Sequence, residues 1–134
     1  MSEKIKWMII TSKAYAKGYK KDMQRFVDQH DPDTYDVIIT SNVKEALKLI
    51  DTMRPELIQL ESHQLNIDCL ALLREIKARH PKVVVFVSID TEYEDDEKLI
   101  GDFLACGAYK CYVVPVWIET LIHDFFVAQN MEEL

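Results

Sequence analysis

One carboxylate, Glu61, directly follows the apolar run Leu57–Leu60 near the middle of the chain. A charged group at the end of a strand can hold a metal ion, accept a phosphoryl group or fix a conformation by its charge. The residues that follow the other apolar runs are mainly hydroxyls, with one further acid: Thr11, Ser12, Ser88 and Asp90. Because Mg²⁺ prefers octahedral oxygen coordination with one or two carboxylates, this set predicts no tight Mg²⁺ site and no other cofactor.

The motifs that bind nucleotides and zinc are absent from the sequence. None of the three glycines lies at a predicted turn from strand to helix, so neither GxGxxG nor a phosphate-binding P-loop is present. The three cysteines are odd in number and lack CxxC spacing, which argues against a disulfide framework and against a zinc site. They are Cys69, Cys106 and Cys111.

The composition is that of one acidic globular domain. The 134 residues carry 16 Lys and Arg against 23 Asp and Glu, a net charge of −7, and 49% are hydrophobic. A negative balance disfavours binding to nucleic-acid phosphates, and no apolar run approaches the roughly 20 residues that cross a bilayer. The first residues show no secretory pattern. We therefore expect a single cytoplasmic domain over 1–134, with a core over about 4–128, that binds neither nucleic acid nor membranes.

Short apolar runs alternate along the chain with longer stretches whose apolar residues recur at helical spacing. The runs predict strands over 5–10, 35–40, 57–60, 83–87 and 112–114. The stretches between them predict helices over 13–29, 43–50 and 67–79, a fourth helix that the acidic stretch 92–97 opens and that continues to about 104, and a fifth from 118 onward. Strands separated by helices predict an α/β fold, a doubly wound parallel five-stranded sheet. In such a sheet, sites form where the strands end, so Glu61 and the strand-end hydroxyls are expected at one edge.

Two local signals predict where helices begin and end. Asn42 and Glu45 have capping-box spacing, which predicts a helix that starts at Val43. Gly107 is expected to cap the fourth helix, because glycine readily adopts the left-handed conformation that often follows a helix.

Four segments stand out for their order and spacing along the chain. They are Arg54–Ser62, Asp68–Ile76, Phe86–Ser88 and Gly107–Pro115. Together they resemble the third strand, the following helix, the fourth strand and the Gly-Ala to Lys-Pro segment of a response-regulator receiver domain. The resemblance extends over about residues 4–128. It implies a flavodoxin-like (βα)₅ fold and a place in bacterial two-component phosphorelay signalling.

The resemblance implies a role for each strand-end position. Glu61 stands at the position of the phosphoacceptor aspartate, and Ser88 at that of the switch hydroxyl. Thr11 and Ser12 occupy the positions of the acidic pair that holds Mg²⁺, and Val114 occupies that of the lysine that neutralises phosphate charge. The site therefore lacks two supports on which phosphotransfer in the family depends.

The fifth strand departs from the family as well. The position of the switch aromatic falls on Cys111, and Tyr112 is one residue along. Since side chains alternate along a strand, Tyr112 is expected to face the opposite side of the sheet.

Phosphorylation of Glu61 by the mechanism of the family is therefore not expected. Formation of an acyl phosphate needs a divalent cation and a cationic side chain to offset charge on the transferring group. Glu also extends one methylene further than Asp, and a misplacement of about 1 Å can cost about 10²-fold in rate. We expect a degenerate receiver, or pseudo-receiver, that is not an enzyme. Glu61 would supply a permanent negative charge and accept a hydrogen bond from Ser88; the alternative is that Glu61 is inert.

Without phosphotransfer, function depends on binding to another protein. The last helix carries the largest apolar side chains, and we expect a partner face at Trp117, Leu121 and Phe126. The resemblance implies a signalling partner, a histidine kinase or an output protein, or a homodimer through the fourth helix, fifth strand and fifth helix. Two alternatives remain open: a receiver that still accepts phosphate through Glu61 or Ser88, and a flavodoxin-like domain that binds a small ligand at the strand ends.

Overall fold

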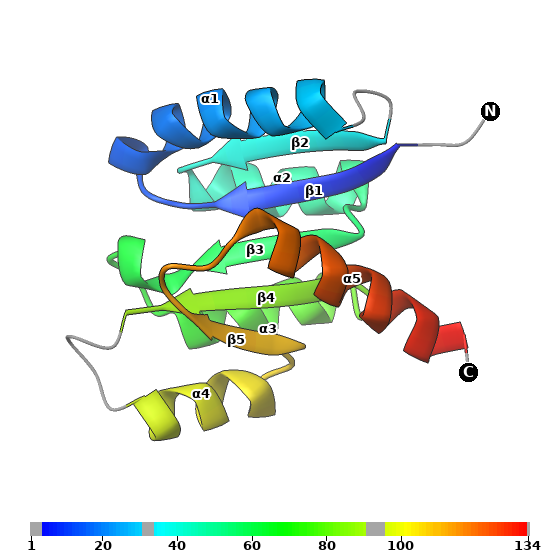
Figure 1. Ribbon diagram of the computed structural model, residues 1–134. Helices are drawn as coiled ribbons and strands as arrows, with labels where there is room; N and C mark the ends of the chain where they lie inside the picture. The colour runs from blue at the N-terminus through cyan, green and yellow to red at the C-terminus, as the bar shows by residue number, and fades with distance from the viewer. Residues whose placement is uncertain (1–3, 31–33, 91–95, 134) are drawn as a thin grey trace.

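The computed structural model describes residues 4–30, 34–90 and 96–133 and has one sheet with helices on both faces (Figure 1). The strands are β1 (Ile5–Ile10), β2 (Tyr35–Thr40), β3 (Leu57–Glu61), β4 (Val84–Ile89) and β5 (Lys110–Val113). The helices are α1 (Lys13–His30), α2 (Val43–Met53), α3 (Cys69–Arg79), α4 (Asp96–Ala105) and α5 (Ile118–Glu133), with a 3-10 helix η1 (Ser62–Gln64). The strand order is β2-β1-β3-β4-β5 and all neighbouring strands are parallel, which confirms the predicted doubly wound α/β fold. None of the helices in these ranges is long and apolar enough to cross a membrane.

The boundaries that differ from the prediction do so for local reasons. α3 begins at Cys69 rather than at 67, because Asp68 Oδ1 accepts a hydrogen bond from the backbone N of Ala71 at 3.0 Å and so caps the helix. β5 begins two residues earlier than predicted, because Lys110 is the parallel partner of Phe86 on β4.

Two hydrophobic cores lie on opposite faces of the sheet. One is shared with α1 and α5, and the other with α2, α3 and α4. Alternate residues of a strand join opposite cores, as the two-residue period requires. In β4, Val84 and Phe86 pack with the α1–α5 core, whereas Val85 and Val87 pack with the other core. Every residue of β3 and β4 is buried, as expected of central strands that are covered on both faces.

Both predicted cap signals are present. Asn42 Oδ1 accepts a hydrogen bond from the backbone N of Glu45 at 3.1 Å and begins α2. Gly107 follows α4 with φ of +113°, and a Cβ at this position would lie 2.9 Å from Cγ of Lys77 on α3. Any other residue at 107 would therefore combine a strained backbone with a close contact.

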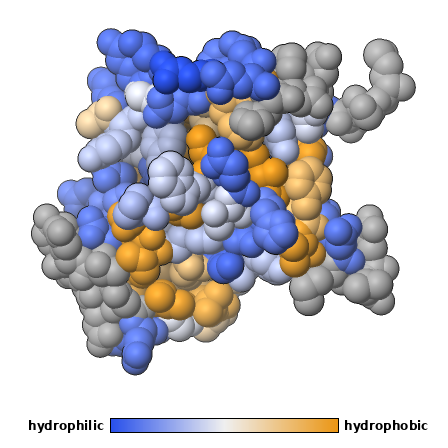
Figure 2. Space-filling model, viewed as in Figure 1, coloured by the Kyte–Doolittle hydropathy of each residue, from blue (hydrophilic) through white to orange (hydrophobic). Residues whose placement is uncertain are grey.

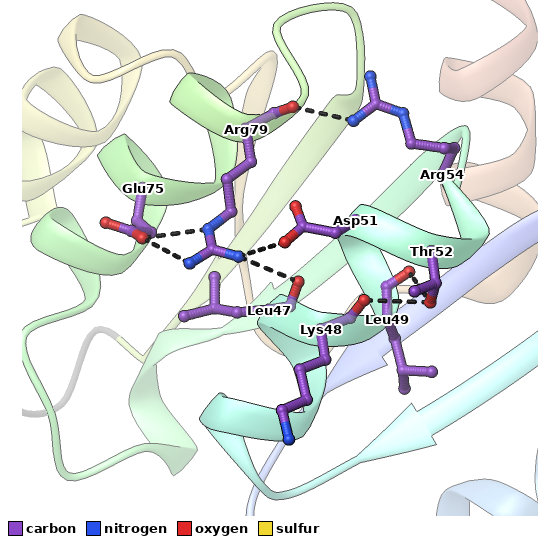
Figure 3. A network of polar contacts seen from close by, with 8 residues as sticks. All are labelled: Leu47, Lys48, Leu49, Asp51, Thr52, Arg54, Glu75 and Arg79. Atoms are coloured by element: carbon purple, nitrogen blue, oxygen red, sulfur yellow. Dashed lines mark hydrogen bonds and ion pairs between the residues drawn. The ribbon is translucent and has the colours of Figure 1, made fainter.

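Arg79 joins α3 to α2 (Figure 3). Its guanidinium pairs with Asp51 Oδ2 at 2.6 Å and with Glu75 Oε1 at 3.0 Å. Its carbonyl oxygen accepts a hydrogen bond from the Arg54 guanidinium at 2.9 Å. Because these charged side chains are a third to a half exposed, we expect each ion pair to contribute only about 0.2–1 kcal/mol. The network orients two helices more than it stabilises the fold.

His80, directly after α3, is held as a neutral side chain. Its Nε2 donates to the carbonyl of Pro55 at 2.9 Å, whereas Nδ1 is buried and has no hydrogen-bond partner among the described residues. Burial lowers the pKa of His80 below its ordinary value of 6.5, because protonation would place a charge in a poorly solvated position.

We expect the free energy of unfolding to fall as the pH drops below about 6.5, since the unfolded chain binds a proton at His80 more readily than the folded chain. The contribution is fully present above that pH and is lost as the pH falls toward the lower pKa of the folded state. Urea unfolding at pH values of about 7.5 and 5.5 measures this dependence. We expect His80→Gln to reduce it and the exposed control His123→Gln to leave it unchanged. If the free energy of unfolding fell equally between pH values of about 7.5 and 5.5 in wild type and in the His80 variant, the result would contradict this account.

Candidate functional site

The strand ends bring Thr11, Glu61 and Ser88 to one edge of the sheet. Glu61 and Ser88 are register partners on β3 and β4, and Thr11 follows β1, which pairs with the other side of β3. The two-residue period turns these side chains to the face that carries Leu57 and Phe86, the face covered by α1 and α5. All three are buried, with at most 2% of their surface exposed. The structure thus places these residues where the predicted topology expects them.

Hydrogen-bond donors enclose the Glu61 carboxylate. Thr11 Oγ1 donates to Oε1 at 2.5 Å, the Tyr19 hydroxyl donates to Oε2, and Gln59 Nε2 approaches Oε2 at 3.5 Å. Among the residues that the structure describes, no lysine, arginine or histidine forms an ion pair with Glu61. Both carboxylate oxygens are therefore occupied by neutral donors, which replace the water that burial removes.

Sequence reasoning identified Glu61 and Thr11 but missed Tyr19 and Gln59. Tyr19 belongs to the inward side of α1, where aromatic residues at helical spacing usually indicate core packing. The signal that could have found it is its position two turns into the helix that follows Thr11, above the strand ends. Gln59 lies two residues before Glu61 and so shares its face of β3, where a buried polar residue in an apolar strand calls for a partner.

Tyr19 links α1 to the end of β3 through a phenol that remains protonated. Burial raises the pKa of Tyr19 well above its ordinary value of 10.0, and the hydrogen bond and the charge of Glu61 raise it further. A neutral phenol beside a carboxylate donates its proton in the hydrogen bond. The Tyr19–Glu61 contact therefore persists across the neutral and alkaline pH range.

Ser88 does not form the predicted hydrogen bond to Glu61. Its Oγ is fully buried and has no hydrogen-bond partner among the described residues. The strand order explains the difference, because β1 and β4 flank β3 on opposite sides. Glu61 takes its hydrogen bonds from Thr11 and Tyr19, on the β1 and α1 side, and so leaves Ser88 unpaired.

The turn after Glu61 is tied to the neighbouring strands. Ser62 Oγ donates to the carbonyl of Ser88 at 3.0 Å, and His63 Nδ1 donates to the same oxygen at 3.2 Å. On the other side, Ser12 Oγ donates to Gln64 Oε1 at 3.3 Å. These contacts join the ends of β1, β3 and β4 into one network.

The donors at this edge do not fit Mg²⁺. Thr11 and Ser12 supply hydroxyls where the ion prefers carboxylates, and both oxygens of Glu61 already accept hydrogen bonds. Within the described ranges, no group of three or more His, Cys, Asp or Glu side chains is placed to hold a metal ion.

Val114, which follows β5, brings no positive charge to the site. Its backbone N donates to the carbonyl of Ile89 at 2.9 Å, and its peptide bond to Pro115 is cis. The backbone thus keeps the chain close to β4, while the apolar side chain cannot neutralise a phosphoryl group.

Cys111 and Tyr112 face opposite sides of the sheet, as predicted. Cys111 packs with the core under α2, α3 and α4, and burial raises the pKa of its thiol to about 11. Tyr112 packs with the α1–α5 core, and its hydroxyl donates to Asp124 Oδ2 on α5. Lys110 Nζ pairs with the same carboxylate at 3.0 Å. The aromatic ring of β5 is thus fixed to α5.

The predicted partner face does not exist as a single surface. Leu121 is only 2% exposed and packs in the α1–α5 core, so it cannot contact a partner. Trp117 and Phe126 are exposed by 76% and 44%, but they are nine positions apart, which places them about half a helical turn out of phase. Inclusion of Leu121 was wrong because it belongs to the inward stripe that separates the two exposed residues.

Solved structures of receiver domains have the same fold. The receiver domain of a DNA-binding response regulator (merR) from Colwellia psychrerythraea 34H aligns with a TM-score of 0.71 at 19% identity, over 97% of this chain and 99% of that chain. The receiver domain of a putative Luxo repressor protein from Vibrio parahaemolyticus gives a TM-score of 0.75 at 13% identity, over 97% and 93%.

A third similar structure contains a metal ion. The receiver domain of the sensor histidine kinase PA1611 from Pseudomonas aeruginosa PAO1, with magnesium coordinated in its active-site cleft, gives a TM-score of 0.68 at 14% identity, over 91% of this chain and 94% of that chain.

No protein-family model and no curated protein sequence matches the chain. The chain therefore has the flavodoxin-like fold of response-regulator receiver domains.

Proposed function

We propose that this protein is a degenerate receiver domain of two-component signalling that acts by binding another protein, without phosphorylation and without enzymatic activity. The observation that carries the proposal is the enclosed carboxylate at the position of the phosphoacceptor. Glu61 is 2% exposed, and Thr11 and Tyr19 occupy its two oxygens.

The enclosed carboxylate is a poor nucleophile for a phosphodonor. An incoming phosphoryl group would have to displace the hydroxyls of Thr11 and Tyr19 and enter a buried position. Position 114 carries valine, and none of the described residues forms an ion pair with Glu61, so no cation would offset the added charge. Transfer of a phosphoryl group depends mainly on such positioning and charge stabilisation, so its rate should be negligible.

The same enclosure supports a permanent charge at Glu61. Two hydroxyls and one amide N–H are directed at the carboxylate, and hydrogen bonds of this kind stabilise an ionised acceptor. Through Tyr19 the charge holds α1 against the sheet edge. In this proposal the domain stays in one conformation, because no phosphate arrives to change the contacts.

The partner surface is assigned to α4, β5 and the outward side of α5. Leu104, Val113, Phe126 and Val127 expose between 38% and 45% of their surface there. In the view with α5 in front, apolar side chains form patches beside hydrophilic ones (Figure 2). Apolar patches with a polar rim favour a protein partner such as a histidine kinase or an output protein.

Incubation with acetyl phosphate and Mg²⁺, followed by intact mass spectrometry, tests the proposal. We expect no added phosphoryl group on the wild-type protein. A Glu61→Gln variant and a Ser88→Ala variant serve as matched controls that remove one acceptor oxygen each. A phosphoryl adduct that Glu61→Gln abolishes would contradict the proposal, and one that only Ser88→Ala abolishes would transfer the acceptor role to Ser88.

A further inference from the structure

Trp117 is the most exposed of the large hydrophobic residues that the structure describes, at 76%. It directly precedes α5, and its carbonyl accepts hydrogen bonds from the backbone N of Thr120 and of Leu121, at 3.1 and 3.3 Å, at the first turn of the helix. The backbone of Trp117 is therefore fixed while its indole extends into solvent. An exposed tryptophan on a fixed backbone is typical of a residue that anchors a protein interface.

The indole lies beside a groove of about 580 Å³ between α1 and the start of α5. Apolar side chains from both elements line it: Tyr19, Phe26, Val116, Trp117 and Ile118. Charged and polar groups complete the lining: Asp22, Arg25, Gln29 and Glu119. Arg25, Asp22 and Glu119 form no ion pair with any described residue, so both signs of charge are available at the groove.

The two helices beside the groove carry opposite charge. α1 has five basic residues, all exposed, against the two acids Asp22 and Asp28, which gives +3: Lys13, Lys17, Lys20, Lys21 and Arg25. α5 has four acidic residues and no lysine or arginine, a formal charge of −4. Asp124 is already paired with Lys110, and Glu119 is the acid of α5 that lines the groove. The helices lie on the same face of the sheet, and the surface over α1, at the top of the view, is strongly hydrophilic (Figures 1 and 2).

A basic helix next to an acidic helix is self-complementary under two-fold rotation. If the axis runs along the groove, α1 of one copy faces α5 of the other, and each positive helix meets a negative one. The same rotation places each Trp117 over the groove of the opposite copy. Arg25 of one copy can then pair with Glu119 of the other, twice in the dimer.

We propose that the groove between α1 and α5 is a dimer interface, occupied by a second copy of this chain. Each Trp117 inserts between Tyr19 and Phe26 of the other copy, and the Arg25–Glu119 pairs set the orientation. This surface is separate from the α4–β5–α5 surface that the proposed function assigns to a signalling partner. Because Tyr19 lines the groove and also donates to Glu61, the carboxylate fixes one wall of the interface.

Sedimentation equilibrium over a range of protein concentrations tests the interface. We expect wild type to show a monomer–dimer equilibrium, and Trp117→Ala to weaken it by at least about 30-fold, the effect of losing a central aromatic anchor. Phe126→Ala is the matched control, because it removes an exposed aromatic residue on the opposite flank of α5 and should leave the equilibrium unchanged. A second readout is the emission of Trp117, which should shift to shorter wavelength on dimerisation while Trp7, 1% exposed, stays constant.

A charge exchange separates this arrangement from other modes of contact. Arg25→Glu and Glu119→Arg should each weaken the dimer by about tenfold, and the double variant should restore it. A monomer at all concentrations, a dimer that Trp117→Ala leaves intact, or a double variant without restoration would overturn the proposal. A dimer broken by Phe126→Ala instead would place the interface on the α4–β5–α5 surface and would equally overturn it.

Discussion

Replacement of Glu61 by alanine is expected to lower the free energy of unfolding by about 3 kcal/mol. Two effects add. The carboxylate leaves a cavity at a fully covered position, and the hydroxyls of Thr11 and Tyr19 lose their buried acceptor. An unsatisfied buried donor costs more than the hydrogen bond itself contributes, because water cannot replace the lost partner. Urea unfolding measures the difference, provided that the free energy of unfolding depends on urea concentration with the same slope in both proteins.

Matched variants separate the hydrogen bonds from the cavity. Thr11→Val keeps the volume and removes one donor, and Tyr19→Phe removes the other; each is expected to cost about 1.5 kcal/mol. Ser88→Ala removes a hydroxyl that has no partner, so its cost should stay within about 0.5 kcal/mol. If Ser88→Ala were as costly as Thr11→Val, Ser88 rather than Thr11 would be the main donor to Glu61, and the account of the site would be wrong.

Conversion of Thr11 and Glu61 to aspartate is expected to create a Mg²⁺ site at the ends of β1 and β3. The double variant Thr11→Asp/Glu61→Asp places two carboxylates at the ends of β1 and β3. The wild-type protein has one carboxylate there, and the Thr11 hydroxyl donates a hydrogen bond to it. Because the two buried acids repel each other, the metal-free variant should be less stable than wild type. Mg²⁺ at about 100 times its dissociation constant should restore about 2.7 kcal/mol.

Thermal unfolding with and without Mg²⁺ measures this gain. Wild type should show no shift beyond the effect of ionic strength, for which the same ionic strength of NaCl is the control. Ca²⁺ in place of Mg²⁺ tests whether the new site prefers the smaller ion. A saturable stabilisation of the wild-type protein by Mg²⁺ would contradict the conclusion that its donors do not fit the ion.

The strands and the faces of their side chains could be predicted from the sequence because they follow from simple periodicities. The β-branched run before Ser88 indicates a strand buried on both faces, and Asn42 and Gly107 mark helix ends by their own backbone chemistry. The same periodicity places Cys111 and Tyr112 on opposite faces. Once the strands are parallel and separated by helices, Thr11, Glu61 and Ser88 must share one edge.

The contacts within the site could not be predicted in the same way. Periodicity gives the face of a strand but not which of two flanking strands a side chain approaches, and the choice of Thr11 over Ser88 depends on where α1 carries Tyr19. Tyr19 has the spacing of a core residue, so nothing local distinguishes a packed ring from a ring with a buried hydroxyl contact. Leu121 was wrongly predicted to lie on the surface. The last helix is apolar on several sides, so its sequence does not show which side faces the core, and tertiary packing decides it.

The central claim is that Glu61 is an enclosed, permanently unphosphorylated carboxylate. Amide chemical shifts of the wild-type protein, recorded during titration with Mg²⁺ and then with beryllofluoride as a mimic of the acyl phosphate, test it most directly. The account predicts no saturable shift at Thr11, Glu61, Ser88 or Tyr19 in either titration. Saturable shifts at these four residues, at millimolar Mg²⁺ or on addition of beryllofluoride, would show that the site opens and binds, and would contradict the claim.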